Sequence, residues 1–162
     1  MSDPLTASIP AHDVVAVLRR RGETVATAES LTAGLLAATI AGVPGASTVL
    51  RGGLIVYATD LKETLAGVDA GVLAHDGPVA RRTAAQLAEG AAERCGADWG
   101  VGLTGVAGPD PQDGHRPGTV FLGIAGPDGT EVTELDLPGD RWGIRIGSVR
   151  AAVSGLLMRA AR

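Results

Sequence analysis

The central stretch of the chain reads Thr24-Val25-Ala26-Thr27-Ala28-Glu29-Ser30-Leu31-Thr32-Ala33-Gly34. Its first five residues predict a short buried strand, and residues 35–41, which follow, predict a helix that is apolar on nearly every side. Ser30 lies where this strand turns into this helix. Serine is a preferred N-cap, but such a turn also sets a hydroxyl beside unpaired main-chain N–H groups that can hold an oxyanion. The residues leave both roles for Ser30, helix cap and nucleophile, open.

Outward from this stretch, the same patterns predict an α/β fold. We expect further strands at 48–58, 98–103, 118–125 and 132–137, with Gly52-Gly53 marking a bulge or a close approach. We expect helices at 12–21, 59–65, 78–95 and 140–160, and a loop at 68–77. This order indicates one domain spanning residues 1–162, in which a mixed sheet is covered by helices as a three-layer sandwich.

Composition excludes several classes of protein. The formal net charge is -4 and aromatic residues make up 2% of the chain, which argues against a nucleic-acid-binding protein. No apolar run reaches the roughly 20 residues that a membrane span needs, and the N-terminus lacks the features of a secretion signal, so we expect a cytoplasmic protein.

The sequence also lacks the usual signals of a bound metal or cofactor. Cys95 is the only cysteine, and the three histidines have no spacing suited to a metal. Neither a Walker loop nor a GxGxxG motif after a strand is present. We therefore expect a site that needs no metal and no cofactor.

One lysine stands out. Of the 14 lysine and arginine residues, Lys62 is the only lysine, and Tyr57, five positions earlier, is the only tyrosine. Arginine keeps its proton in proteins, whereas a partly buried lysine can lose its proton and act as a base. A lysine near the start of a helix would have its pKa lowered by the helix dipole, while Asp60 and Glu63 act in the other direction. Lys62 is either a chance survivor on a solvated helix or a residue that arginine cannot replace.

Four residues are candidates for catalysis: Ser30, Tyr57, Lys62 and Thr104. A serine hydroxyl is a poor nucleophile unless a neighbour takes its proton, and a neutral lysine can be that base. The Gly-rich loop that opens with Thr104-Gly105 can offer main-chain N–H groups to an oxyanion or a phosphate. Arg141 and Arg145 lie four apart on one helix face and can hold a phosphate or a carboxylate.

A set of motifs resembles one known family. They are Ala28-Glu29-Ser30-Leu31-Thr32-Ala33-Gly34, Pro44-Gly45-Ala46-Ser47, Arg51-Gly52-Gly53-Leu54-Ile55-Val56-Tyr57-Ala58, Lys62, Leu65-Ala66-Gly67-Val68, Thr104-Gly105-Val106-Ala107-Gly108-Pro109, Pro117-Gly118-Thr119-Val120 and Gly139-Asp140-Arg141. Their order resembles the CinA C-terminal-domain family, over about residues 12–157. The family includes the nicotinamide-nucleotide amidohydrolases.

The resemblance implies a reaction and a site. The reaction is hydrolysis of the carboxamide of nicotinamide mononucleotide to nicotinate mononucleotide and ammonia, in pyridine-nucleotide salvage. The implied site is metal-free and built on serine and lysine with a tyrosine nearby, roles that fall on Ser30, Lys62 and Tyr57. We expect the substrate to be bound by Thr32, Gly34, Gly53, Thr104, Gly105, Arg141 and Arg145.

The chain departs from the family pattern in two places. The family wording after the serine is Cys-Thr-Gly-Gly, where this chain has Leu31-Thr32-Ala33-Gly34, and residues 112–117 also differ from the common form. Larger CinA proteins carry a further N-terminal nucleotide-processing domain, and no pyrophosphatase activity is inferred for this chain.

Two alternative functions remain open. One is a non-catalytic nucleotide-binding or assembly domain that keeps the family pocket, and the other is hydrolysis of a different small amide. We also expect a homo-oligomer, with a dimer allowed by apolar residues on the last helix: Ile144, Ile146, Leu156 and Leu157.

Overall fold

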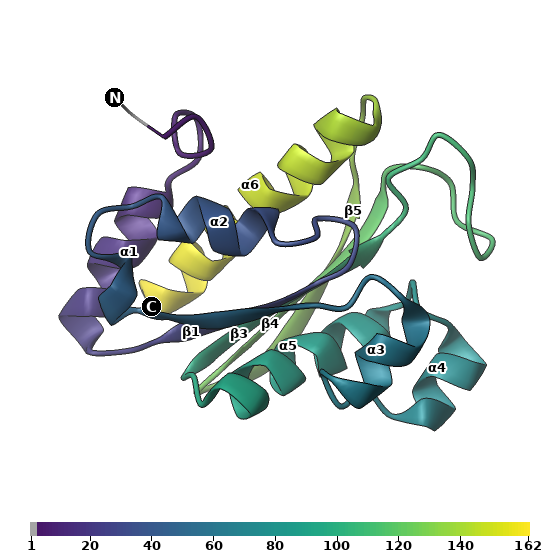
Figure 1. Ribbon diagram of the computed structural model, residues 1–162, viewed down its shortest axis with the longest axis horizontal. Helices are drawn as coiled ribbons and strands as arrows, with labels where there is room; N and C mark the ends of the chain where they lie inside the picture. The colour runs from purple at the N-terminus through teal and green to yellow at the C-terminus, as the bar shows by residue number, and fades with distance from the viewer. Residues whose placement is uncertain (1–2) are drawn as a thin grey trace.

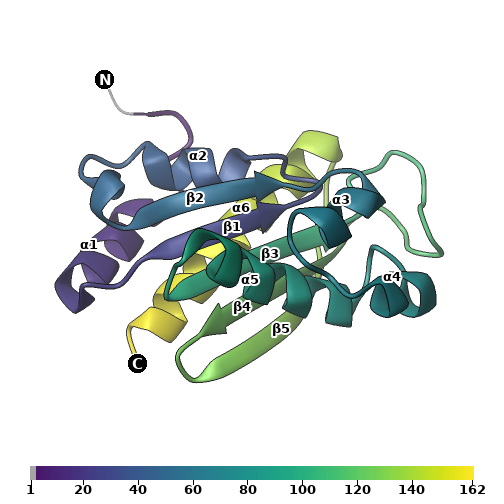
Figure 2. The same cartoon turned by 60° about the horizontal axis from the view of Figure 1, so that its bottom comes forward.

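The computed structural model describes residues 3–162 and contains one five-stranded mixed sheet, in the order β2-β1-β3-β4-β5 (Figure 2). The strands are β1 (Val25–Glu29), β2 (Leu50–Ile55), β3 (Trp99–Gly105), β4 (Thr119–Gly126) and β5 (Gly129–Asp136). β1 runs parallel to both β2 and β3, whereas β4 is antiparallel to β3 and to β5. The α/β class and the mixed sheet expected from the sequence are confirmed.

Helices cover both faces of the sheet, which gives the three layers seen in Figure 1. One face carries α1 (Ala11–Arg21), α2 (Leu35–Ala41) and α6 (Arg141–Ala160). The other carries α5 (Arg81–Cys95), with α3 (Thr59–Thr64) and α4 (Ala70–Asp76) beside it. A one-turn 3-10 helix, η1 (Ala46–Thr48), precedes β2.

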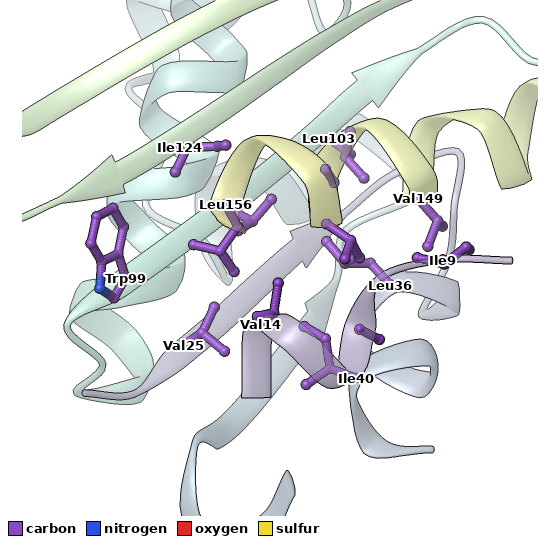
Figure 3. Close-up of a cluster of buried hydrophobic side chains, with 14 of the residues drawn as sticks. Ile9, Val14, Val25, Leu36, Ile40, Trp99, Leu103, Ile124, Val149 and Leu156 are labelled. Carbon is purple, nitrogen blue, oxygen red and sulfur yellow. The ribbon is translucent and has the colours of Figure 1, made fainter. Parts of the chain in front are cut away.

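The main core lies between the sheet and the helices α1, α2 and α6. Figure 3 shows Leu156 and Val149 of α6 beside Val14 of α1 and Leu36 of α2. Alternate strand residues such as Val25 and Leu103 point into this core, as a period of two requires.

Two of the residues expected to support a dimer belong to this core. Ile144 and Leu156 are each 1% exposed, and Ile146 and Leu157 pack against the same cluster. These residues therefore pack one face of α6 against the rest of the monomer. No helix within residues 3–162 is long and apolar enough to cross a bilayer.

On the opposite face, the sheet offers small residues to α5. Ala26 and Ala28 of β1 and Gly100 and Gly102 of β3 lie at the positions that alternate with the core residues. A Cβ atom on Gly102 would lie 2.6 Å from the main-chain nitrogen of Ala88 in α5. This close approach requires glycine and seats α5 directly on β3.

Four predicted elements have clearly different bounds in the structure, and one of them is the strand predicted at 132–137, which is β5 and begins at Gly129. Within the predicted loop at 68–77, residues Ala70–Asp76 form helix α4, because the Asp69 side chain accepts the Val72 N–H at 3.0 Å and caps this short helix. The helix predicted from residue 78 begins at Arg81, after a bend at Pro78-Val79-Ala80. Strand β2 ends at Ile55, and the register shift between Val25 and Ala26 in the β1–β2 pairing confirms the predicted irregularity near Gly52.

Candidate active site

Ser30 follows β1 directly and does not cap a helix. Helix α2 begins at Leu35, five residues after Ser30, and Gly34 is in its N-cap position. The Glu29 carboxylate accepts the N–H groups of Leu36 and Ala37, at 2.8 and 3.0 Å. Glu29 thus accepts the N–H groups at the start of α2, which is the role that the cap hypothesis gave to Ser30. That hypothesis is wrong. Helix α2 is also less buried than predicted, since its outer face exposes Ala38 and Ala41.

Lys62 lies in α3 and reaches Ser30 from the opposite side of the cavity. Its side chain is 2% exposed, and its Nζ atom lies 3.1 Å from Ser30 Oγ. The same Nζ donates to the carbonyl oxygens of Val56, at 2.9 Å, and Tyr57, at 3.4 Å. A neutral amine has two hydrogens and one lone pair. When both hydrogens point to these carbonyls, the lone pair is left for the Ser30 hydroxyl.

Burial lowers the pKa of Lys62 to about 8, because the charged form is poorly solvated there. The helix dipole considered from the sequence does not explain this shift, because Lys62 lies in the last turn of α3, where the dipole favours a cation. The carbonyl oxygens that accept hydrogen bonds from Nζ favour the protonated form of the amine. No carboxylate adds to this effect, because none of the salt bridges within residues 3–162 involves Lys62. A lysine in this position changes protonation state within one or two pH units of neutrality.

A cavity of about 270 Å³ opens beside this pair. It lies at the carboxyl ends of the parallel strands β1 and β3, which is where open α/β sheets generally bind ligands. The segment from Thr104 to Gln112 forms one wall, and Pro78-Val79 forms another. Figure 1 shows α3, α4 and the long loop between β3 and β4 gathered at this end of the molecule.

Arg141 links two parts of the cavity rim. From the first turn of α6, its guanidinium donates to Tyr57 Oη at 2.9 Å and to the Gly108 carbonyl at 2.6 Å. Tyr57 is 56% exposed, so its ring stands at the mouth of the cavity. The site thus joins a serine, a buried amine, a phenol and a fixed cation, a combination suited to hydrolysis of a small anionic substrate.

The family model described as "CinA C-terminal domain" matches residues 8–160. This chain belongs to the CinA C-terminal-domain family.

Relatives of this CinA domain are similar in sequence over most of its length. It is 49% identical over 140 residues to a "CinA-like protein" from Frankia casuarinae, covering 86% of this chain and 32% of that protein. It is 46% identical over 148 residues to a "Putative competence-damage inducible protein" from Geobacillus, covering 91% of this chain and 36% of that protein. The chain thus spans about a third of the length of these curated relatives.

Solved structures have the same fold. The competence/damage inducible protein CihA from Agrobacterium tumefaciens has a TM-score of 0.83 at 32% identity, covering 93% of this chain and 96% of that one. A CinA superfamily protein from Klebsiella pneumoniae has a TM-score of 0.90 at 27% identity, covering 93% of this chain and 95% of that one.

Six of the ten predicted site residues line the cavity of the CinA domain: Ser30, Tyr57, Lys62, Thr104, Gly105 and Arg141. The first and third are in direct contact, and Tyr57 joins them through its carbonyl oxygen and through Arg141. The main prediction from the residues, a lysine amine within reach of the Ser30 hydroxyl, is therefore met by the geometry.

The other four, Thr32, Gly34, Gly53 and Arg145, lie outside the cavity lining, so the structure does not place them against a bound substrate. Arg145 donates to the carbonyl oxygens of Leu31 and Thr32, at 2.9 and 3.3 Å, so it holds the turn after Ser30. Gly34 has a φ of 96°, which only glycine adopts readily, and Gly53 lies against Thr27. The hydroxyl of Thr32 is fully buried and, within residues 3–162, has no hydrogen-bond partner.

Sequence reasoning missed several members of the site. Thr59, Pro78, Asp110 and Gln112 also line the cavity, but each comes from a loop or helix start with no pattern of its own. Glu29 was quoted within a motif and given no role, because a carboxylate that accepts helix N–H groups seven and eight residues later has no local capping pattern. No group of three or more His, Cys, Asp or Glu side chains in residues 3–162 is arranged to hold a metal.

Proposed function

We propose that this CinA domain is an amidohydrolase that converts nicotinamide mononucleotide and water to nicotinate mononucleotide and ammonia, in cytoplasmic pyridine-nucleotide salvage. The observation that carries the proposal is the buried contact of 3.1 Å between Lys62 Nζ and Ser30 Oγ. The names of the relatives state no reaction, so the chemistry rests on this geometry and on the family resemblance.

Acylation begins with neutral Lys62. Its amine accepts the proton of the Ser30 hydroxyl, and Ser30 Oγ forms a bond to the carboxamide carbon. The developing oxyanion is stabilised by main-chain N–H groups, from the turn that follows Ser30 or from Thr104-Gly105. The Lys62 ammonium then gives its proton to the amide nitrogen, the C–N bond breaks, and ammonia leaves.

Deacylation uses the same base. Lys62, neutral again, accepts a proton from water as the water oxygen attacks the acyl carbon. The bond between that carbon and Ser30 Oγ breaks, Ser30 recovers its proton from Lys62, and nicotinate mononucleotide is released. Proton transfer therefore passes through one amine in both halves of the cycle.

Arg141 is the cavity's fixed cation and is the group proposed to bind the phosphate. Its guanidinium is held by Tyr57 and Gly108 in a position that leaves the cavity side open to an anion. Tyr57, exposed at the mouth, offers an aromatic face to the pyridine ring.

An ammonia-release assay tests this function. The parent protein and Ser30→Ala are compared on nicotinamide mononucleotide, other pyridine nucleotides, nicotinamide and simple amides. We expect the mononucleotide to be the best substrate and Ser30→Ala to be inactive. Release from another amide alone would change the substrate, and a rise in melting temperature with the mononucleotide without ammonia would indicate a non-catalytic binding domain.

A further inference from the structure

The hydroxyl hydrogen of Thr104 is already donated in a hydrogen bond within the protein. Its Oγ1 lies 2.6 Å from the carbonyl oxygen of Pro78, and a carbonyl only accepts hydrogen bonds, so the Thr104 hydrogen points to Pro78. The residue is 1% exposed and lines the cavity. Toward the cavity, Thr104 Oγ1 therefore offers lone pairs and no hydrogen.

Thr104 lies directly beside Ser30. Glu29 pairs with Leu103 in the parallel β1–β3 ladder, and the Ser30 N–H donates to the Leu103 carbonyl at 2.9 Å. This pattern continues the register by one residue, so Ser30 and Thr104 are neighbours at about the 4.8 Å spacing of adjacent strands. Both side chains follow the alternation that turns Ala28 and Gly102 toward α5, and both line the cavity.

We propose that Thr104 Oγ1 accepts a hydrogen bond from the –NH2 group of the substrate, which makes Thr104 the residue that selects primary amides over the matching acids and esters. The inference rests on the proposed function and adds the source of its selectivity. A carboxamide offers two N–H donors, whereas a carboxylate or an ester oxygen only accepts. An acceptor placed against Thr104 would leave two buried acceptors facing each other without a hydrogen between them.

The same contact orients the amide for attack by Ser30. With its nitrogen held at Thr104, the amide turns its carbonyl carbon toward Ser30 Oγ on the neighbouring strand. When the C–N bond breaks, the nitrogen takes a proton from the Lys62 ammonium and leaves as ammonia. The acid product has no N–H to give to Thr104, so this contact favours substrate over product.

Three variants test the assignment. Thr104→Val removes the hydroxyl at nearly constant volume, Thr104→Ser keeps it, and Thr83→Val is the matched control. Thr83 is also fully buried and donates to the neighbouring carbonyl, that of Gly77 at 2.7 Å, but lies outside the cavity lining. Each variant is assayed for ammonia release from nicotinamide mononucleotide and for hydrolysis of the methyl ester of nicotinate mononucleotide.

We expect Thr104→Val to lower kcat/KM for the amide by about 10- to 100-fold and to leave kcat/KM for the ester unchanged or higher, since only the amide uses the hydroxyl and the ester no longer meets an opposing acceptor. Thr83→Val should stay near the parent for both substrates, and Thr104→Ser, which keeps the hydroxyl, should retain more of the amide activity than Thr104→Val. An equal loss on amide and ester in Thr104→Val would overturn the inference, because a merely structural role affects both.

A binding measurement keeps the inference independent of turnover and of the stability of Thr104→Val. In Ser30→Ala, calorimetry compares nicotinamide mononucleotide with nicotinate mononucleotide at pH 9, where Lys62 is mostly neutral because its pKa is about 8. We expect the amide to bind at least about tenfold more tightly, and adding Thr104→Val to remove the preference.

The outcomes separate the two proposals. Amide preference that depends on Thr104, in a protein that releases no ammonia, would overturn the proposed reaction and support Thr104 as the selective residue. Ammonia release by the parent with equal binding of both ligands, or binding of neither ligand in Ser30→Ala, would overturn the role of Thr104.

Discussion

At the scale of single residues, the site depends on a lysine that the fold keeps from being solvated. The sequence singled out Lys62 as the only lysine, but it did not report that the folded chain buries this side chain. Only the three-dimensional contacts reveal that two main-chain carbonyls take up the amine hydrogens. A Ser30–Lys62 pair could be predicted from residue types, whereas the burial that lowers the pKa of Lys62 could not.

The first prediction concerns stability and pH. Burial holds the pKa of Lys62 near 8 in the folded chain, while the unfolded chain keeps this proton up to about 10.5. Between these values the unfolded state binds more protons, so the free energy of unfolding rises with pH, by up to about 3 kcal/mol. Urea unfolding of the parent and Lys62→Met at pH 7 to 10.5 measures this. The difference between them should grow with pH in favour of the parent, and parallel curves would contradict a buried, titrating amine.

The second prediction separates two arginines one helical turn apart. Arg141→Met should raise KM for nicotinamide mononucleotide at least about tenfold with little change in stability, because Arg141 faces the cavity. Arg145→Met should instead lower stability by about 1–3 kcal/mol and reduce kcat, because it frees the carbonyls of Leu31 and Thr32 behind Ser30. Steady-state kinetics and thermal melts read both effects, and identical behaviour of the two variants would contradict this division.

At the scale of elements, the sequence predicted most strands and helices because their apolar patterns are local. It failed at α4, where a short helix depends on the Asp69 cap, and at the start of α5, where Pro78 serves as an acceptor for Thr104. The strand at 98–103 was predicted, but its packing distance was out of reach, because nothing in the sequence indicates that Gly100 and Gly102 lie against α5. The close seat of α5 is what brings Pro78 to the site.

The third prediction tests the close packing of α5 on β3. Gly102→Ala should destabilise the fold by about 3 kcal/mol, since its new Cβ would lie 2.6–2.8 Å from main-chain and side-chain atoms of α5. Gly52→Ala is the matched control in β2, where the nearest atom is Cys95 Sγ at an ordinary 3.6 Å, and it should change stability by less than about 1 kcal/mol. Denaturant unfolding compares the two variants. Equal costs would show that α5 packs less closely than described.

At the scale of the whole molecule, four elements from distant parts of the chain converge on one cavity. The turn after β1 supplies Ser30, α3 supplies Lys62, β3 supplies Thr104 and α6 supplies Arg141. The parallel pairing of β1 with β3 brings the first and third together, and helices from opposite faces of the sheet bring the others (Figure 1). The sequence motifs indicated these residues through a family resemblance, but only the topology explains why they meet.

The fourth prediction follows from a cavity formed by the whole fold. In Ser30→Ala, which should bind without turnover, nicotinamide mononucleotide at 100 times its Kd should stabilise the folded state by about 2.7 kcal/mol. The rise in melting temperature should disappear in Ser30→Ala with Arg141→Met at the same concentration. A rise of the same size in both proteins would place the nucleotide elsewhere.

The central claim is that a neutral Lys62 takes the proton of Ser30, and the pH dependence of ammonia release tests it most directly. For the parent acting on nicotinamide mononucleotide, kcat/KM should rise about tenfold per pH unit below pH 8 and level off above it, because the pKa of Lys62 is about 8. Lys62→Arg, which keeps the charge but cannot give up its proton, should lose at least about 100-fold at every pH. A profile that is flat through pH 8, or a Lys62→Arg variant as active as the parent, would contradict the account.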